Sequence, residues 1–183
     1  MIKYPTLKTN RLILRGFRIS DAPKIQKMAG IFEIADTTLN IPHPYPDGKA
    51  EEWIKSHEAD YRKKTGIHFA ITLESTAELI GAIGLMDIEQ AHFRAEMGYW
   101  ITKEFWNQGF ATEAARAVVN YAFKDLNLER LFAQHFERNP ASGKVLKKIG
   151  MKKEGILRSH IKKWGKYEDI VVYGILRSDT SNE

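Results

Sequence analysis

Hydrophobic residues along the chain recur with two different periods, and the changes between them predict the order of the elements. Apolar positions alternate or form short runs in residues 9–17, 67–73, 79–87, 93–101 and 131–137, which is typical of strands. They recur every three to four residues in 21–29, 48–64 and from about 110 to 124, which is typical of helices. Strands over 153–161 and 167–176 complete the set.

Capping residues indicate where the helices begin and end. Ser20 and Asp47 are expected to cap the helices that follow them. Pro140 and Gly150 bracket a short helix over residues 140–149, because proline suits a first turn and glycine suits the position after a helix.

Two connections have contrasting composition. Residues 31–46 contain Pro42, Pro44 and Pro46, so we expect this segment to be irregular. The polar turn Glu74–Glu78 instead joins two strands into an antiparallel hairpin, and Gly81 and Gly84 in its second strand suggest a bulge.

The resulting order, β-α-α-β-β-β-α-β-α-β-β, favours one α+β domain around a mixed sheet, spanning residues 1–177. No linker, repeat or low-complexity segment divides it. The polar tail, residues 178–183, is expected to be frayed.

Composition restricts the chemistry. The 183 residues include no cysteine, which excludes disulfides, thiolate zinc sites and a cysteine nucleophile. No apolar run is long enough to span a membrane, and the amino-terminal residues lack the features of a signal peptide. We therefore expect a cytoplasmic protein without a membrane partner.

The formal net charge is +5, and much of the excess is concentrated in the last third of the chain. Such a balance favours an anionic ligand, although a solvated basic surface would have the same composition. The late basic residues are Lys144, Lys147, Lys148, Lys152, Lys153, Arg158, Lys162, Lys163 and Lys166.

Residues 96–125 hold the strongest candidate for a binding site. A strand is followed by a turn in which Gly109 and Ala111 carry little or no side chain, and then by a helix. Backbone N–H groups at such a helix start lack partners within the helix and attract anions, and the Thr112 hydroxyl adds a donor. Alternatively, Gly109 only ends a loop and Thr112 only caps the helix.

Five segments together carry a family resemblance that covers nearly the whole chain. The segments are Thr9–Arg15 with Asp21; Leu79–Gly84; Glu96–Ile101; Trp106–Ala114; and Asn139–Ser142 with Leu146–Met151. On these segments the chain resembles the GNAT N-acetyltransferase superfamily, and within it the RimJ/RimL-like branch of ribosomal-protein acetyltransferases.

The resemblance implies a three-layer GNAT fold with four helices and a mixed, mostly antiparallel sheet of about seven strands. It implies that strands 93–101 and 131–137 splay apart and hold the acetyl thioester between them. Acetyl-CoA is the implied cosubstrate, an amine is the implied acceptor, and no metal is expected.

The same resemblance assigns cofactor-binding roles to particular residues. Backbone groups of Tyr99, Trp100 and Ile101 should pair with the pantetheine arm, and Asn139 should bond to that arm or to a water. The pyrophosphate should be bound by the turn and helix start, namely Asn107, Gln108, Gly109, Phe110, Ala111 and Thr112.

The chain departs from the wider superfamily at two positions. Trp106 replaces the usual arginine or glutamine of the phosphate-binding motif, and Leu146 stands where many members carry a tyrosine general acid. Ser142, one turn after Asn139, is our candidate proton donor to the CoA sulfur. A solvated helix serine is the alternative.

A base must remove a proton from the acceptor amine. Glu96 is the first candidate, and its alternative role is a salt bridge on a strand. His135 is a second candidate for the base and a candidate contact for the substrate. Because successive side chains of a strand point to opposite faces, His135 and Gln134 lie on different faces, and at most one of them faces the cleft that binds the substrate. A histidine buried for structural reasons is its alternative.

The acceptor is the least defined part of the function. His43 and Tyr45 lie in the loop that walls the acceptor site in this branch, and a rigid turn without substrate contact is the alternative. The leading hypothesis is direct acetyl transfer to a protein N-terminal α-amine.

Two other functions remain open. One is acetylation of a small amine such as a polyamine, amino acid or antibiotic. The other is a basic ribosome- or RNA-binding module without catalysis, although nucleic acid is not expected as a partner. The protein is expected to be a monomer or a homodimer.

Overall fold

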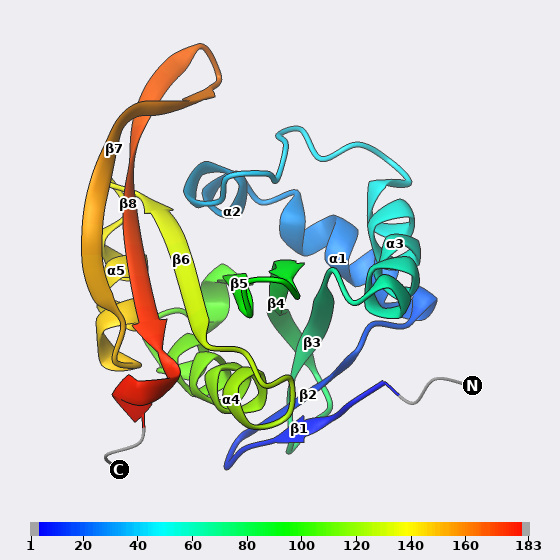
Figure 1. Ribbon diagram of the computed structural model, residues 1–183. Helices are drawn as coiled ribbons and strands as arrows, with labels where there is room; N and C mark the ends of the chain where they lie inside the picture. Colours follow the sequence, from blue (N-terminus) through cyan, green and yellow to red (C-terminus); the bar gives the residue numbers. More distant parts are fainter. Residues whose placement is uncertain (1–3, 181–183) are drawn as a thin grey trace.

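The computed structural model describes residues 4–180 and contains one eight-stranded sheet (Figure 1). Its strand order is β1-β2-β3-β4-β5-β6-β8-β7, and every neighbouring pair is antiparallel except β5 and β6. The strands are β1 (Leu7–Lys8), β2 (Leu12–Gly16), β3 (Ile67–Leu73), β4 (Leu79–Glu89), β5 (Arg94–Ile101), β6 (Arg130–Phe136), β7 (Lys152–Lys163) and β8 (Lys166–Leu176).

Helices cover both faces of this sheet, as the three-layer expectation requires. One core joins the sheet to α4 and α5, and a second joins it to α1 and α3. The helices are α1 (Ala22–Ala29), α2 (Phe32–Thr37), α3 (Lys49–Lys63), α4 (Phe110–Lys124) and α5 (Pro140–Lys148). The long β7–β8 hairpin curves above the sheet toward α2 (Figure 1).

The predicted fold class is confirmed, with one more strand and one more helix than expected. The short strand β1 pairs with β2 through Leu7–Leu14 and Lys8–Ile13. Helix α2 occupies part of the segment that was expected to be irregular, so that prediction was wrong for residues 32–37. The prolines lie downstream of α2 and do not oppose it.

Both predicted N-caps were wrong. Ser20 lies inside a 3-10 turn, and Asp21 precedes α1 instead, its carboxylate bonded by Arg15 and by the Arg18 N–H. Helix α3 begins after Gly48, which has a φ of 75° and replaces Asp47 at the cap position. A turn that requires positive φ therefore decided this boundary.

The predicted bulge in this strand is confirmed beside Gly81, and Gly84 pairs regularly. Ile71 pairs with Gly81 and Thr72 with Leu79, so Ile80 is the extra residue, and the register shifts again between Met86 and Glu89. A Cβ at position 81 would lie 2.2 Å from the Trp100 carbonyl oxygen, so close approach of β5 explains this glycine.

The end of the described chain is ordered by Asp179. Its carboxylate accepts hydrogen bonds from Lys152 Nζ at 2.6 Å and from the Leu176 N–H at 3.0 Å. Of the tail expected to fray, residues 181–183 lie outside the described residues, as do residues 1–3. Across residues 4–180, no helix combines the length and apolar character needed to cross a bilayer.

Candidate active site

The parallel strands β5 and β6 pair over only three residues and then separate. The pairs are Arg94–Arg130, Ala95–Leu131 and Glu96–Phe132. Beyond them β5 stays bonded to β4, and β6 stays bonded to β8. We call the gap beyond Glu96 and Phe132 the fork. It confirms the predicted splay and leaves backbone groups on its two sides without a strand partner.

Alternation along β5 directs its side chains to different sides of the sheet. Met97 and Tyr99 contact the core formed with α4 and α5, whereas Trp100 packs against the core formed with α1 and α3. Glu96 lies four residues before Trp100 in the strand, so the two side chains point to the same face of the sheet. The fork therefore has Tyr99 on one face and Glu96 on the other.

The small-residue turn and the start of α4 provide donors for an anion. Asn107 and Gly109 have φ values of 60° and 81°, and α4 begins at Phe110. The first helical bond runs from the Glu113 N–H to the Gly109 carbonyl at 3.0 Å. The preceding N–H groups, up to Thr112, therefore lack partners within the helix and can bind phosphate oxygens.

Two side chains hold this turn against the strand that precedes it. Trp106 Nε1 donates to the Ile101 carbonyl at 2.6 Å, and Gln108 Nε2 donates to the Glu104 carbonyl at 3.0 Å. Trp106, which cannot bind phosphate by charge, thus fixes the backbone of the turn.

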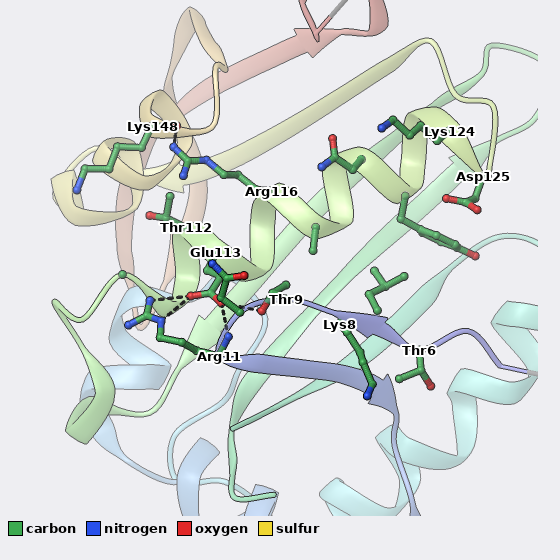
Figure 2. A pocket seen from close by; sticks show the side chains of 16 residues that line it. Thr6, Lys8, Thr9, Arg11, Thr112, Glu113, Arg116, Lys124, Asp125 and Lys148 are labelled. Carbon is green, nitrogen blue, oxygen red and sulfur yellow. Dashed lines mark hydrogen bonds and ion pairs between the residues drawn. The ribbon is translucent and has the colours of Figure 1, made fainter. Parts of the chain in front are cut away.

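The amino-terminal strands fix the turn from the other side (Figure 2). Glu113 of α4 accepts hydrogen bonds from Thr9 Oγ1 at 2.7 Å and from the Arg11 N–H at 2.9 Å, and it pairs with the Arg11 guanidinium at 2.7 Å. Arg11 Nη1 also donates to the Gln108 carbonyl at 3.1 Å. This positioning role of Arg11 is not visible in the sequence, because its partner lies 102 residues away.

A cavity of about 870 Å³ begins at Gly109 and follows α4 as far as Asp125 (Figure 2). Its basic side chains outnumber its acidic ones and are Lys8, Arg11, Arg116, Lys124 and Lys148. It adjoins the turn at Gly109 and does not include the fork. Lys148 is thus the one late lysine that lines it.

Asn139 and Ser142 begin α5 beside the fork. Asn139 Oδ1 accepts from the Ser142 N–H at 3.3 Å, and Asn139 Nδ2 donates to the Thr37 carbonyl at 3.4 Å. Tyr99 brings its hydroxyl to 2.9 Å from Ser142 Oγ. Burial raises the pKa of Tyr99 to about 12, although the bond to Ser142 opposes this shift. The phenol is therefore protonated at neutral pH.

Glu96 lies where the paired part of β5 ends. Burial raises the pKa of its carboxyl, the negative charge of Asp87 raises it further, and a hydrogen bond from Gln134 opposes both. Gln134 Nε2 lies 3.4 Å from Glu96 Oε1 across the fork. A carboxyl with a raised pKa is a better base than an exposed one.

His135 lies under α5, away from Glu96. Its ring is 6% exposed, its Nδ1 lies 2.7 Å from the Phe136 carbonyl, and its Nε2 would lie 2.9 Å from a Cβ at position 143. The ring therefore explains why position 143 is a glycine. The structure brings Gln134, and not His135, to the face of the sheet that carries Glu96.

The segment 36–43 meets the tip of the β7–β8 hairpin, and we call these two parts together the roof. Lys163 Nζ donates to the carbonyl groups of Thr38, Leu39 and Ile41. Phe32 stacks on Trp164 with 5.3 Å between ring centres, and His43 packs edge-on against Phe32 at 5.3 Å. These contacts hold the roof closed above the sheet.

The two loop residues predicted to contact substrate occupy different environments. His43 belongs to the aromatic part of the roof. Tyr45 packs against the core of α1 and α3, its carbonyl accepts from Gln26 Nε2 at 3.2 Å, and burial raises the pKa of its hydroxyl. Arg138 supports the roof by pairing with Asp36 at 2.9 Å and with Glu168 at 3.0 Å.

The sheet opens between the parallel strands β5 and β6, and the turn at Gly109 leads into a helix whose first N–H groups lack partners within the helix. The family model described as "Acetyltransferase (GNAT) domain" matches residues 11–152, and the chain belongs to this family. The protein is therefore an acetyl-CoA-dependent N-acetyltransferase.

Several relatives extend this assignment. The chain is 38% identical over 174 residues to the uncharacterized N-acetyltransferase YoaA of Bacillus subtilis, covering 95% of this chain and 98% of the relative. It is 24% identical to the [ribosomal protein uS5]-alanine N-acetyltransferase of Escherichia coli, covering 94% and 91%. It is 30% identical to the spermidine N(1)-acetyltransferase of Escherichia coli, covering 54% and 53%.

A solved structure supports the fold. RimL, a ribosomal L7/L12 alpha-N-protein acetyltransferase in complex with coenzyme A, superposes with a TM-score of 0.87 at 16% identity, covering 94% of this chain and 98% of that one. At this identity the likeness concerns the fold alone.

Proposed function

We propose that this N-acetyltransferase transfers the acetyl group of acetyl-CoA to a protein N-terminal α-amine. The observation that carries the proposal is the match to the uS5-alanine acetyltransferase, which covers 94% of the chain and so includes most of the acceptor-side segments. The Escherichia coli spermidine acetyltransferase matches 54% of it in sequence, whereas a solved spermidine N-acetyltransferase chimera covers 94% of it at 23% identity.

The charges around the roof agree with this acceptor. A polyamine carries several positive charges and is best bound by free carboxylates. Here Asp36 and Glu168 both pair with Arg138, and Glu33 pairs with Lys103 at 2.5 Å.

The acid–base requirements of the reaction agree as well. An α-amine has a pKa near 8, about two units below that of an alkyl amine, so it needs only a weak base. We assign this role to Glu96, which accepts the amine proton directly or through water. The neutral nitrogen then attacks the thioester carbonyl, and a backbone N–H of β5 at the fork stabilises the oxyanion.

Collapse of the tetrahedral intermediate breaks the carbon–sulfur bond, and the electron pair goes to sulfur. We assign the proton that sulfur receives to Ser142, whose oxygen regains a proton from water while Glu96 releases the amine proton to water. The turn residues Asn107–Thr112 bind the pyrophosphate through their N–H groups, while Tyr99–Ile101 and Asn139 bind the pantetheine arm. No covalent bond to the enzyme forms at any step, and the net reaction is acetyl-CoA plus amine giving amide plus CoA.

A thiol-release assay tests the acceptor. One peptide begins with a free alanine and contains an internal lysine, a second is identical but carries an Nα-acetyl group, and spermidine is the third acceptor. We expect CoA release with the first peptide and at most a few per cent of that rate with the other two. Faster release with spermidine would refute the proposed acceptor, and release with both peptides would assign the activity to lysine.

A further inference from the structure

The contact between Tyr99 and Ser142 spans the two elements that flank the thioester site. Tyr99 is on β5 and Ser142 is in the first turn of α5, 43 residues later. The Tyr99 ring packs against the core beneath α4 and α5. Only its hydroxyl reaches a polar partner, and that partner is the serine to which we assign the proton of the leaving thiol.

Counting donors and acceptors favours one direction for this hydrogen bond. A tyrosine and a serine hydroxyl each have one proton to donate. The Tyr99 hydroxyl has two acceptors, Ser142 Oγ at 2.9 Å and the Ser142 carbonyl at 3.2 Å. Within α5, that carbonyl faces the N–H four residues later, as in any helix. The closer hydroxyl oxygen is therefore the better acceptor for Tyr99.

The direction matters for the chemistry. If Ser142 donated its proton to Tyr99, none would remain for sulfur. If Tyr99 donates to Ser142 Oγ, the serine proton is free and the serine oxygen is polarised, which strengthens it as a donor. Among residues 4–180, Ser142 Oγ has no other hydrogen-bond partner.

We propose that Tyr99 is a positioning residue for acetyl transfer: its phenol donates to Ser142 Oγ and so leaves the serine proton directed toward the CoA sulfur. This inference rests on the proposed function of Ser142. The Tyr99–Ser142 pair takes the place of the tyrosine acid that is usual in the family. In this chain Leu146 stands at the position of that acid, is fully buried and carries no hydroxyl. The high pKa of Tyr99, caused by its burial, keeps the phenol a donor throughout the neutral range.

The test removes one hydroxyl at a time. Tyr99→Phe keeps the packed ring, and we expect its kcat to fall about tenfold, the effect of losing one hydrogen bond in the transition state. Its KM for acetyl-CoA should stay within about twofold. Tyr173→Phe is the matched control, because Tyr173 also lies beside α5, is even more buried than Tyr99, and does not have Ser142 among its hydrogen-bond partners within residues 4–180.

Combining variants separates positioning from packing. If Tyr99 acts through Ser142, the double variant Tyr99→Phe with Ser142→Ala should be no slower than Ser142→Ala alone. Multiplied effects would show that Tyr99 acts independently and would overturn the inference. So would unchanged kcat in Tyr99→Phe, or an equal loss in Tyr173→Phe. Melting temperatures of all variants report on folding.

The acceptor in these assays is the free-alanine peptide, or spermidine if that is the faster substrate. Loss of activity in Ser142→Ala without loss in Tyr99→Phe refutes only the role of Tyr99. Full activity in Ser142→Ala refutes the proton-donor role on which this inference depends. An enzyme that turns over neither acceptor contradicts the proposed function itself.

Discussion

Arg11 and Glu113 join the amino-terminal strands to the first turn of helix α4. Arg11 Nε and Nη2 both lie 2.7 Å from Glu113 Oε2, while the Arg11 backbone N–H donates to Oε1 at 2.9 Å. One carboxylate at a helix start thus receives both the side chain and the main chain of a distant residue. It also offsets the positive end of the α4 dipole.

Removing this carboxylate should weaken cofactor binding. Glu113→Ala leaves the Arg11 N–H without its acceptor and the Thr9 hydroxyl with only the Leu12 carbonyl at 3.3 Å, so we expect about 1–2 kcal/mol lower stability. CoA affinity should fall about three- to tenfold, because the turn loses one of its supports. Calorimetry and urea unfolding measure the two effects. Glu89→Ala, which breaks the exposed pair with Arg94, should change stability by less than about 0.5 kcal/mol.

A carboxylate placed at Gly109 should abolish CoA binding. Gly109→Glu introduces negative charge where we expect phosphate, and it strains a backbone with a φ of 81°. Gly165→Glu controls for strain, since its φ is 83° and a Cβ there meets no atom within 4 Å. CoA should raise the melting temperature of the control and not that of Gly109→Glu. An equal rise in both variants would mean that the phosphates bind elsewhere.

Glu96 should determine the acidic limb of the pH profile. A raised pKa means that the carboxylate is lost at a higher pH than usual, so kcat/KM should begin to fall above pH 4.5 as the solution is acidified. Glu96→Gln should lower kcat/KM about 10- to 100-fold at pH 7 and remove this limb. Asp87→Asn removes a like charge and should move the limb to lower pH. Glu74→Gln, at an exposed turn, should leave the profile unchanged.

Lys163 should affect the acceptor and not the acetyl donor. Its ammonium bonds to three carbonyl groups of the roof, so Lys163→Met should free the segment 36–43 and raise the KM of the acceptor about fivefold or more. The KM for acetyl-CoA should remain unchanged. Lys162→Met removes an exposed neighbouring charge as a control. Equal changes in both KM values would indicate general loss of structure.

His57 should make the protein less stable in acid. The ring is 4% exposed, and within residues 4–180 neither ring nitrogen has a hydrogen-bond partner. Burial lowers its pKa to about 3, and the neighbouring His68 contributes to the shift. The unfolded chain binds this proton near pH 6.5 and the folded chain does not. Stability should therefore fall by up to about 1.4 kcal/mol per pH unit below pH 6.5.

His57→Phe tests this assignment by urea unfolding between pH 4.5 and 7. The variant should lose less stability on acidification than the wild type, and at pH 7 it should be as stable or more so, because it buries no unpaired nitrogen. His92→Phe, at a side chain that is 68% exposed, should retain the wild-type slope. Parallel pH curves for wild type and His57→Phe would contradict the prediction.

Local sequence signals predicted the elements that depend on local interactions. The bounds of β3 and the end of α4 at Lys124 were correct, since a turn and a helical period mark them within a few residues. Helix α2 was missed because its six residues are too few to display a helical period. The cap at Ser20 failed because Arg15 holds the carboxylate of Asp21, and this pairing depends on the path of β2.

In the candidate site, too, the features that depend on local sequence were predicted, and those that depend on tertiary packing were not. The Asn139 cap and the turn at Gly109 follow from residue types at fixed offsets, and both were predicted as parts of the site. The contact of Tyr99 with Ser142 depends on the angle at which α5 crosses the fork. No spacing in the sequence encodes that angle, so the pairing became visible only in three dimensions.

The three-residue pairing of β5 with β6 has a further consequence. A strand edge normally exposes N–H and C=O groups that can pair with other chains, and proteins shield such edges. Here two unpaired edges face each other inside the sheet, with α4 and α5 covering one face. The unpaired backbone groups of the fork can therefore form hydrogen bonds with a narrow ligand. A strand of another polypeptide is too wide to enter between β5 and β6, so these edges do not promote aggregation.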